Sequence, residues 1–238
     1  MLSSRLRTLL IYLLLRILHR LYYVGGRRIR YISISIDHND SLRIILLPQV
    51  FIPKYTLNQM VLCKILHNVR GKFIYELCSG SGLISLHLAQ RNRVVASDIM
   101  YNAVLSTKLN AKVNKRWDNI DVIQMDKGNA LRCSVFDIVV LNPPYLPLDA
   151  RDNTDTLYCC GSNLKLLLQL IINSLKLVKK EGRVYILVND VVLDYVIMLV
   201  KRLNLKAKVT PVLKTPLDRI FVVELEKQFN CVYRKFVT

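Results

Sequence analysis

The sequence lacks the Cys-x-x-Cys spacing of zinc sites and lacks a long apolar run near its N-terminus. Its six cysteines are scattered, and the neighbouring Cys159 and Cys160 make a poor disulfide. We therefore expect reduced thiols, a cytoplasmic protein and no metal site. The longest uncharged run of the N-terminal segment, residues 8–15, is too short to span a bilayer. Because no small-residue cleavage site follows, we expect neither a signal peptide nor a transmembrane segment.

Acidic residues are also scarce. The chain carries 35 Lys and Arg against 17 Asp and Glu, which gives a formal net charge of +18 and a pI near 9.8. Residues 1–30 contain no acid, and they hold seven arginines: Arg5, Arg7, Arg16, Arg20, Arg27, Arg28 and Arg30. This balance favours a polyanionic partner such as RNA, the ribosome or an anionic membrane face.

The apolar and basic pattern of residues 1–23 predicts a helix with two distinct sides. One side carries Arg5, Arg16, His19 and Arg20. The other side carries the larger apolar set of Leu6, Leu10, Leu13, Leu14, Ile17 and Leu21. A basic amphipathic helix of this kind can contact RNA, a membrane surface or a partner protein. The alternative is a helix that packs on its own domain.

Gly25 and Gly26 end this helix, and a β-hairpin is expected next. Its strands are predicted at residues 30–36 and 42–47, around a turn at residues 37–40. We therefore expect a helix and hairpin extension over residues 1–47 and one large domain over residues 48–238. With 52% hydrophobic residues, the chain can bury a full core.

Strand and helix patterns alternate through the large domain, which is typical of a parallel sheet with helices on both faces. Helices are expected at residues 57–68, up to residue 90, and at 103–114, 162–178 and 191–203. Strands are expected at residues 72–77, 93–97, 120–125, 136–141, 183–188, 205–213 and 219–226, with a turn at residues 180–182. The last two strands have no helix between them. The sequence thus predicts an α/β, Rossmann-like fold with seven core strands.

A glycine-rich turn follows the first core strand and contains Cys78, Gly80 and Gly82. A strand, a glycine turn and a helix let the backbone approach a nucleotide-like ligand closely. A nicotinamide cofactor is disfavoured because Ser85 stands where its fingerprint needs a third glycine. Asp98 ends the second strand, where an acid is placed to bind ribose hydroxyls. The plain alternative for Asp98 is a solvated acid at a strand end.

The most informative stretch is the fourth strand, residues 136–141, which runs into Asn142, Pro143, Pro144 and Tyr145. Two prolines fix φ twice and donate no hydrogen bond, so the chain must leave the sheet here. An amide and an aromatic ring are thereby held on a stiff turn at the carboxyl end of a strand. In open α/β sheets, ligands bind at that edge. The alternative is an ordinary Pro-Pro loop.

This Asn-Pro-Pro-Tyr tetrapeptide resembles the signature of class I S-adenosylmethionine-dependent methyltransferases that modify planar NH₂ nitrogens. The glycine turn is similar to their Glu-x-Gly-x-Gly-x-Gly pattern, with Glu76 in the acidic position and Cys78 replacing the first glycine. The family also carries a proline-containing segment that closes over the cofactor, which Pro53 and Thr56 fit loosely. The resemblance implies S-adenosylmethionine as cofactor. It implies the following cofactor-binding residues: Glu76, Cys78, Gly80, Gly82, Asp98, Asp126 and Asn142.

Within this superfamily the chain looks most like the HemK-type protein-glutamine methyltransferases, in their compact archaeal and eukaryotic branch. The resemblance implies N5-methylation of the glutamine in the Gly-Gly-Gln loop of a translation release factor. The implied catalytic residues are Asn142, Pro143, Pro144 and Tyr145. The Asn142 oxygen and the Pro143 carbonyl would hold the nitrogen, and Tyr145 would pack on the amide plane. Orientation alone can supply roughly 7–11 kcal/mol, so no nearby base is required.

Two other functions stay open. A nucleobase presents the same flat NH₂ group, so N6-adenine or N2-guanine methylation of RNA or DNA is the main alternative, with a flipped base as substrate. A catalytically silent scaffold with a basic arm is the third. The compact branch also implies a small zinc-ribbon activator that adds to an edge strand. The third core strand, with Ile120, Val122 and Ile123, is expected at that edge.

Overall fold

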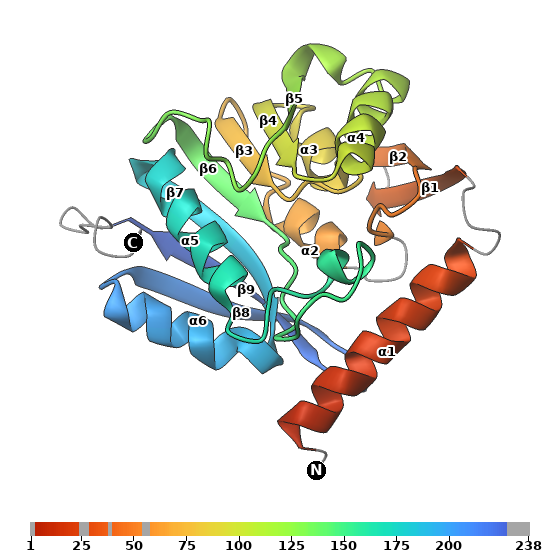
Figure 1. The fold of residues 1–238 in the computed structure, drawn as a ribbon. Coiled ribbons are helices and arrows are strands. Elements are labelled where there is room, and N and C mark those ends of the chain that lie inside the picture. The colour runs from red at the N-terminus through yellow and green to blue at the C-terminus, as the bar shows by residue number, and fades with distance from the viewer. Residues whose placement is uncertain (1–2, 24–28, 38–39, 54–57, 228–238) are drawn as a thin grey trace.

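A computed structural model describes residues 3–23, 29–37, 40–53 and 58–227 of the chain. Its centre is a seven-stranded sheet in the order β5-β4-β3-β6-β7-β9-β8 (Figure 1). The strands are β3 (Phe73–Leu77), β4 (Arg93–Asp98), β5 (Ile120–Gln124), β6 (Phe136–Leu141), β7 (Val178–Asn189), β8 (Lys206–Lys214) and β9 (Arg219–Glu226). The strands β3 to β7 pair in parallel, and β9 runs antiparallel to both of its neighbours. The predicted Rossmann-like sheet is confirmed.

Helices cover both faces of the sheet because apolar side chains alternate along its buried strands. In β6, Ile138 and Val140 face one apolar core, and Val139 and Leu141 face the other. The first core is covered by α2 (Asn58–Ile65), α3 (Leu83–Leu88) and α4 (Tyr101–Val113). The second core is covered by α5 (Lys165–Leu177) and α6 (Asp190–Arg202). The described residues also include the short 3₁₀ turns η2 (Trp117–Asn119) and η3 (Asp155–Leu157).

The predicted turn at residues 180–182 is wrong, because these residues remain inside β7. The β6–β7 register jumps here: Phe136 pairs with Val178, whereas Ile138 pairs with Arg183. The extra residues are accommodated as an irregularity of the strand rather than as a turn. Gly182 permits the close approach, since a Cβ there would lie 2.6 Å from the carbonyl oxygen of Asp137.

The predicted helices α2, α3 and α5 are shorter than expected. In α5 the first turn is displaced from residue 162 to Lys165, because Leu164 adopts a left-handed conformation with φ at 58°. A right-handed helix cannot include a residue in that conformation. None of the predicted site residues lies in α5, so its later start does not affect them.

The predicted hairpin is present as β1 (Arg30–Asp37) and β2 (Asp40–Leu46). Its inner side chains join the same apolar core as α3 and α4, among them Ile34, Leu42 and Ile44. The Asn110 side chain of α4 accepts a hydrogen bond from the Ile45 amide at 2.7 Å. The hairpin therefore packs directly on the large domain, and a division after residue 47 stays a prediction. Part of the predicted hairpin turn, at residues 38–39, lies outside the described residues.

The N-terminal helix α1 (Ser4–Tyr22) lies along one edge of the molecule (Figure 1). It packs on its own domain through Ile11, Tyr12 and His19, next to Tyr158. Burial and the nearby Arg16 lower the pKa of His19 to about 4, so the ring is neutral. This is the alternative that the sequence left open for this segment. In the described part of the chain, no helix is long and apolar enough to cross a membrane.

Candidate active site

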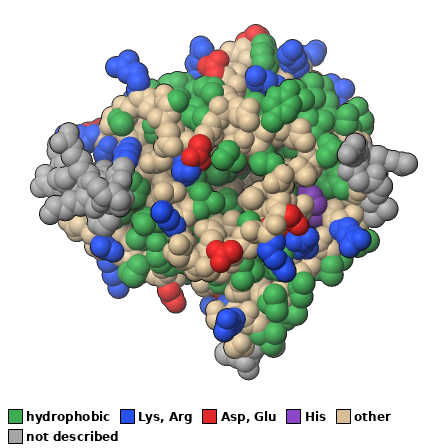
Figure 2. Space-filling model, viewed as in Figure 1, with side chains coloured by type: hydrophobic (Ala, Val, Ile, Leu, Met, Phe, Trp, Pro, Cys, Tyr) green, Lys and Arg blue, Asp and Glu red, His purple; other side chains and the backbone are tan. Residues whose placement is uncertain are grey.

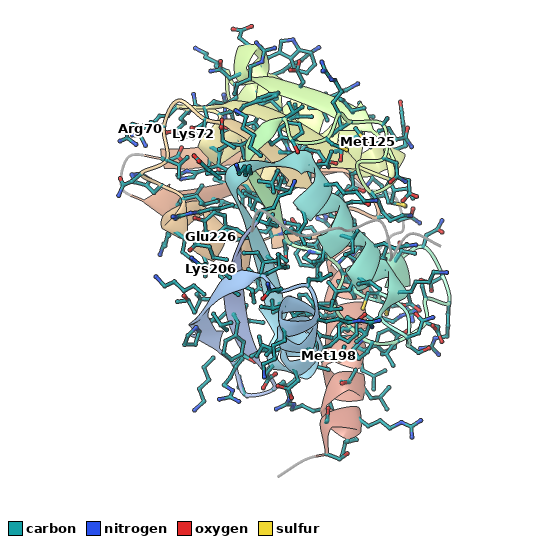
Figure 3. The ribbon with its side chains drawn as sticks, turned by 90° about the vertical axis from the view of Figure 1, so that its left-hand side faces the viewer. Arg70, Lys72, Met125, Met198, Lys206 and Glu226 are labelled. Atoms are coloured by element: carbon teal, nitrogen blue, oxygen red, sulfur yellow. The ribbon has the colours of Figure 1, made fainter. Side chains whose placement is uncertain are left out.

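Most of the predicted site residues meet in one cavity of about 320 Å³ at the carboxyl ends of the central parallel strands. Figure 3 shows the polarity of the sheet, with Arg70 and Lys72 before β3 at one end and Met125 after β5 at the other. The predicted residues that line the cavity are Cys78, Gly80, Asp98, Asp126, Asn142, Pro143, Pro144 and Tyr145. Glu76 and Gly82 are not among its lining residues.

The turn after β3 has left-handed backbone at three alternate positions. The φ angles are 64° at Cys78, 55° at Gly80 and 78° at Gly82. Gly82 is also constrained sterically, because a Cβ there would lie 2.7 Å from Cγ2 of Thr107. A left-handed conformation costs a non-glycine residue roughly 1–2 kcal/mol, and Cys78 bears this strain. Cys78, which replaces the first glycine of the pattern, therefore keeps the left-handed backbone that a glycine would adopt there.

Glu76 stabilises this turn through hydrogen bonds to Ser85. The Ser85 amide donates a 2.9 Å hydrogen bond to its Oε2, and the Ser85 hydroxyl bonds to the same oxygen. Burial raises the pKa of Glu76 to about 8. The Oε1 atom of Glu76 has no partner within the described residues. Glu76 thus ties the end of β3 to the start of α3, and its direct contact with a cofactor stays a prediction.

Asp98 joins two loops at the cavity wall. Its Oδ2 accepts a hydrogen bond from the Gly80 amide and its Oδ1 accepts one from the Met100 amide, both at 2.9 Å. Burial raises the pKa of Asp98, and these amide hydrogen bonds oppose the rise. A carboxylate offers about four acceptor positions, so Asp98 can still accept two hydroxyl groups. A ribose diol has that chemistry.

Asp126 lies at the end of β5 and forms an ion pair with Lys127, which also lines the cavity. Lys127 has a φ of 52°, and its carbonyl accepts a hydrogen bond from the Asn173 side chain at 3.0 Å. A side chain of α5 therefore fixes the position of the loop that follows β5. Sequence reasoning missed Lys127, although its place beside Asp126 was visible.

The Asn-Pro-Pro-Tyr turn lies where β6 leaves the sheet, as predicted. Pro143 is buried, whereas Asn142 and Tyr145 are half-buried and line the cavity. The Tyr145 hydroxyl accepts a 3.2 Å hydrogen bond from the Asn58 side chain, and the side chain packs against each of the three apolar clusters found among the described residues. Burial raises the pKa of Tyr145, which keeps the phenol neutral.

Asn58 and Gln59 are site residues that sequence reasoning missed. Gln59 is buried, lines the cavity, and has an Oε1 atom without a partner in the described structure. Buried polar atoms are nearly always hydrogen-bonded, so this oxygen is suited to a ligand donor. A polar pair at the start of an apolar helix was the available signal. Of the two residues predicted to cover the cofactor, Pro53 is buried but does not line the cavity, and Thr56 lies outside the described residues. Phe51, two residues before Pro53, does line it.

An apolar wall closes the other side of the cavity. It is formed by α1, the segment before α2, the loop around η3, and α5, through Leu15, Phe51, Leu157, Tyr158, Leu166 and Leu170. The loop is fixed to the signature turn, because the Leu146 amide donates to the Tyr158 carbonyl at 2.8 Å. Sequence reasoning missed the contribution of α1. A mostly apolar cavity with a few convergent polar groups is typical of a small-molecule site.

Comparisons with known proteins agree with this geometry. The family model described as methyltransferase small domain matches residues 54–207, which is more than half of the chain. A Methanocaldococcus jannaschii protein named as a protein N5-glutamine methyltransferase is 29% identical over 77% of this chain and 95% of that protein. A release factor glutamine methyltransferase of Lactococcus lactis is 30% identical over 56% of this chain and 46% of that protein.

Solved structures share the fold. A 16S rRNA N2 methyltransferase of T. thermophilus, solved in complex with AdoMet and guanosine, has a TM-score of 0.67. It is 21% identical, and the match covers 84% of this chain and 51% of that chain. At this identity the likeness concerns the fold alone. By the match to its family model, and with relatives named as glutamine methyltransferases, the chain belongs to the methyltransferase small domain family.

Proposed function

We propose that this chain transfers a methyl group from S-adenosylmethionine to the side-chain amide nitrogen of a glutamine. The proposed substrate is the glutamine of the Gly-Gly-Gln loop of a translation release factor. One observation carries the proposal: Asp98 and Asn142 line the same cavity, although they follow different strands. An acceptor for a ribose diol and a holder for a flat NH₂ group thus share one space.

The residues present fit S-adenosylmethionine. Gly80 and Asp98 would hold the ribose, Asp126 would meet the adenine amino group, and Gln59 offers a buried acceptor without a partner. When bound, the cofactor supplies an activated methyl group on a sulfonium. Cys78 would contribute through its backbone, because its left-handed conformation shapes the turn where the residue lines the cavity.

The chain's own residues would orient the substrate. The lone pair of an amide nitrogen is delocalised, so the nitrogen is a poor nucleophile. The Asn142 oxygen and the Pro143 carbonyl can each accept one of its N–H groups, and Tyr145 can pack on the amide plane. The apolar wall around Leu157 and Tyr158 would exclude water. The reaction releases one proton, and we expect it to pass to solvent when the methylated amide leaves the cavity, because the signature contains no base.

Methylation of a nucleobase is the second candidate, and the net charge of +18 favours it. However, part of the basic N-terminal segment, residues 1–30, is paired with acidic residues of the same protein. Arg7 forms an ion pair with Asp190 at 3.2 Å, and Arg16 forms one with Asp155 at 2.7 Å. Two of the N-terminal arginines are thus neutralised within the protein. The near full-length match to the M. jannaschii relative supports the glutamine substrate.

The experiment is methyl transfer from labelled S-adenosylmethionine to purified release factor or to total RNA, each in separate reactions. We expect label in the release factor and a loss of about 100-fold in rate for Asn142→Ala, because a misplaced nucleophile costs about that much. Asn68→Ala is the matched control, since Asn68 is exposed and is not a lining residue of the cavity. Label in RNA alone would make nucleobase methylation the first candidate in place of glutamine methylation. A wild-type rate in Asn142→Ala would refute the mechanism.

We also propose that a small zinc-ribbon activator adds to β5. The predicted edge position of this strand is confirmed. Ile120 is buried and Ile123 is 37% exposed, so the strand offers its backbone edge and one apolar side chain. We expect the amides of residues 120–124 to exchange hydrogen more slowly when the activator is added. Unchanged exchange there would contradict strand addition. With such a substrate and activator, we propose that the protein works in the cytoplasm.

A further inference from the structure

The outward face of α1 is an apolar stripe with no partner among the described residues. It consists of Leu6, Leu9, Leu13, Leu14, Ile17 and Leu21, whose exposed fractions range from 44% to 63%. These positions recur three or four residues apart, so their side chains lie on one side of the helix. Figure 2 shows hydrophobic side chains gathered along this edge of the molecule. Single exposed leucines are common, but a continuous stripe marks an interaction surface.

The stripe cannot turn inward, because the opposite face of α1 is fixed. The Tyr12 hydroxyl donates to the fully buried Asp155 at 3.0 Å, and Arg16 donates to the same carboxylate at 2.7 Å. Arg7 is held by Asp190. Rotating the helix would remove two partners of the buried Asp155 charge, Tyr12 and Arg16, and leave it those from Arg151, which is unfavourable. The outward leucines are therefore a permanent feature of the surface.

The charges around the stripe indicate what covers it. Arg5 and Arg20 are exposed, and neither forms an ion pair with an acidic residue within the described part of the chain. The first acidic residue of the chain is Asp37. An antiparallel pairing of α1 with a second copy would bring Arg5 of one chain towards Arg20 of the other. A surface that is apolar inside and negatively charged outside satisfies both features of the helix.

We propose that α1 docks this protein on an anionic phospholipid surface. The stripe would enter the boundary between headgroups and acyl chains, and Arg5 and Arg20 would contact the lipid phosphates. Leu15 points to the opposite side, where it lines the cavity. Docking through the stripe therefore leaves the catalytic cavity free. The inference is independent of whether the methylated group is an amide or a base.

The test is co-sedimentation of the full chain with vesicles of phosphatidylcholine alone and with added phosphatidylglycerol. We expect binding only when phosphatidylglycerol is present. The double variant Leu13→Glu/Ile17→Glu should lose roughly tenfold or more in affinity, because it places two carboxylates in the apolar face. The matched control is Met198→Glu/Val209→Glu, which should bind like the wild type. It changes two exposed apolar residues, Met198 on α6 (labelled in Figure 3) and Val209 on β8.

The arginines are tested separately. Arg5→Gln/Arg20→Gln should weaken vesicle binding by about fivefold for each arginine, and added salt should reduce that difference. Circular dichroism and cofactor binding must match the wild type in every variant, which separates docking from folding. The proposal would be overturned by an absence of vesicle binding by the wild type, by equal binding to uncharged vesicles, or by a wild-type dimer that Leu13→Glu/Ile17→Glu dissociates. Binding of the arginine-bearing helix to RNA with no vesicle binding would also overturn it.

Discussion

The two sides of the cavity are built in different ways. The side with Cys78, Gly80, Asp98 and Asp126 consists of short segments that each follow a strand of one parallel sheet. The other side combines α1 with the loop around η3, and their main ion pair joins residues 139 positions apart in the sequence. The first side is therefore local in the chain, and the second depends on long-range contacts. We expect mutations on the two sides to have different effects on stability and on the affinity for S-adenosylmethionine.

The largest effect is expected from Asp155→Asn on the long-range side. Asp155 is fully buried and accepts hydrogen bonds from Tyr12, Arg16 and the Arg151 amide. Breaking a buried charge pair costs about 3–5 kcal/mol of unfolding free energy. Chemical denaturation measures this loss, and titration with S-adenosylmethionine should show unchanged affinity in the remaining folded protein.

Asp152→Asn is the matched control for that prediction. Asp152 also pairs with Arg16, at 2.9 Å, but its side chain is 46% exposed. An exposed ion pair contributes about 0–1 kcal/mol. If the two variants lost the same stability, the buried network would not be what fixes α1.

The next effect is expected from Gly82→Ala on the local side. The new Cβ would meet Thr107, and the backbone is already left-handed. We expect a loss of about 1–3 kcal/mol of unfolding free energy and a weaker affinity for S-adenosylmethionine in calorimetry. Gly71→Ala serves as control, because Gly71 has a φ of 64° but no atom within 4 Å of a Cβ. Equal losses in both variants would remove the steric part of the argument.

The last prediction concerns the pH dependence of stability at Glu76, and it is measured as a slope rather than as a loss at one pH. Its pKa in the folded protein is raised from 4.5 to about 8, so the unfolded chain releases this proton at a lower pH. The folded state then holds more protons than the unfolded state between pH 4.5 and 8, and stability falls as pH rises through that window, at up to about 1.4 kcal/mol per pH unit. Glu76→Gln should flatten this slope in denaturation series. An unchanged slope would mean that Glu76 is ionised when folded.

The sequence predicted the local side well. Each strand end that carries a site residue is where the pattern put it, because a buried parallel strand has a continuous apolar run that its terminal polar residue interrupts. The predicted turn at residues 180–182 was wrong for a related reason. A glycine between charged residues resembles a turn, and only the neighbouring backbone of Asp137 shows that Gly182 serves a close strand approach.

The sequence left two placements open for α1, exposed or packed on its own domain. A helical wheel groups Arg16 and His19 with the exposed Arg5 and Arg20, but the structure turns Arg16 and His19 towards the domain. Asp155 is the reason, since a buried carboxylate must be paired, and two of its partners, Tyr12 and Arg16, come from a segment that no local pattern connects to it. The apolar face that the wheel identified thereby remains outside.

By itself, the sequence determined the sheet, the glycine turn and the place of the Asn-Pro-Pro-Tyr signature, because these depend on residue order within single strands and turns. The tertiary structure alone decided that α1 supplies Leu15 to the cavity, that Gln59 faces it, and that Glu76 supports the turn from below. Those outcomes depend on which distant side chains satisfy a buried charge or fill a buried space. Such pairings are set by packing in three dimensions, which no periodicity along the chain records.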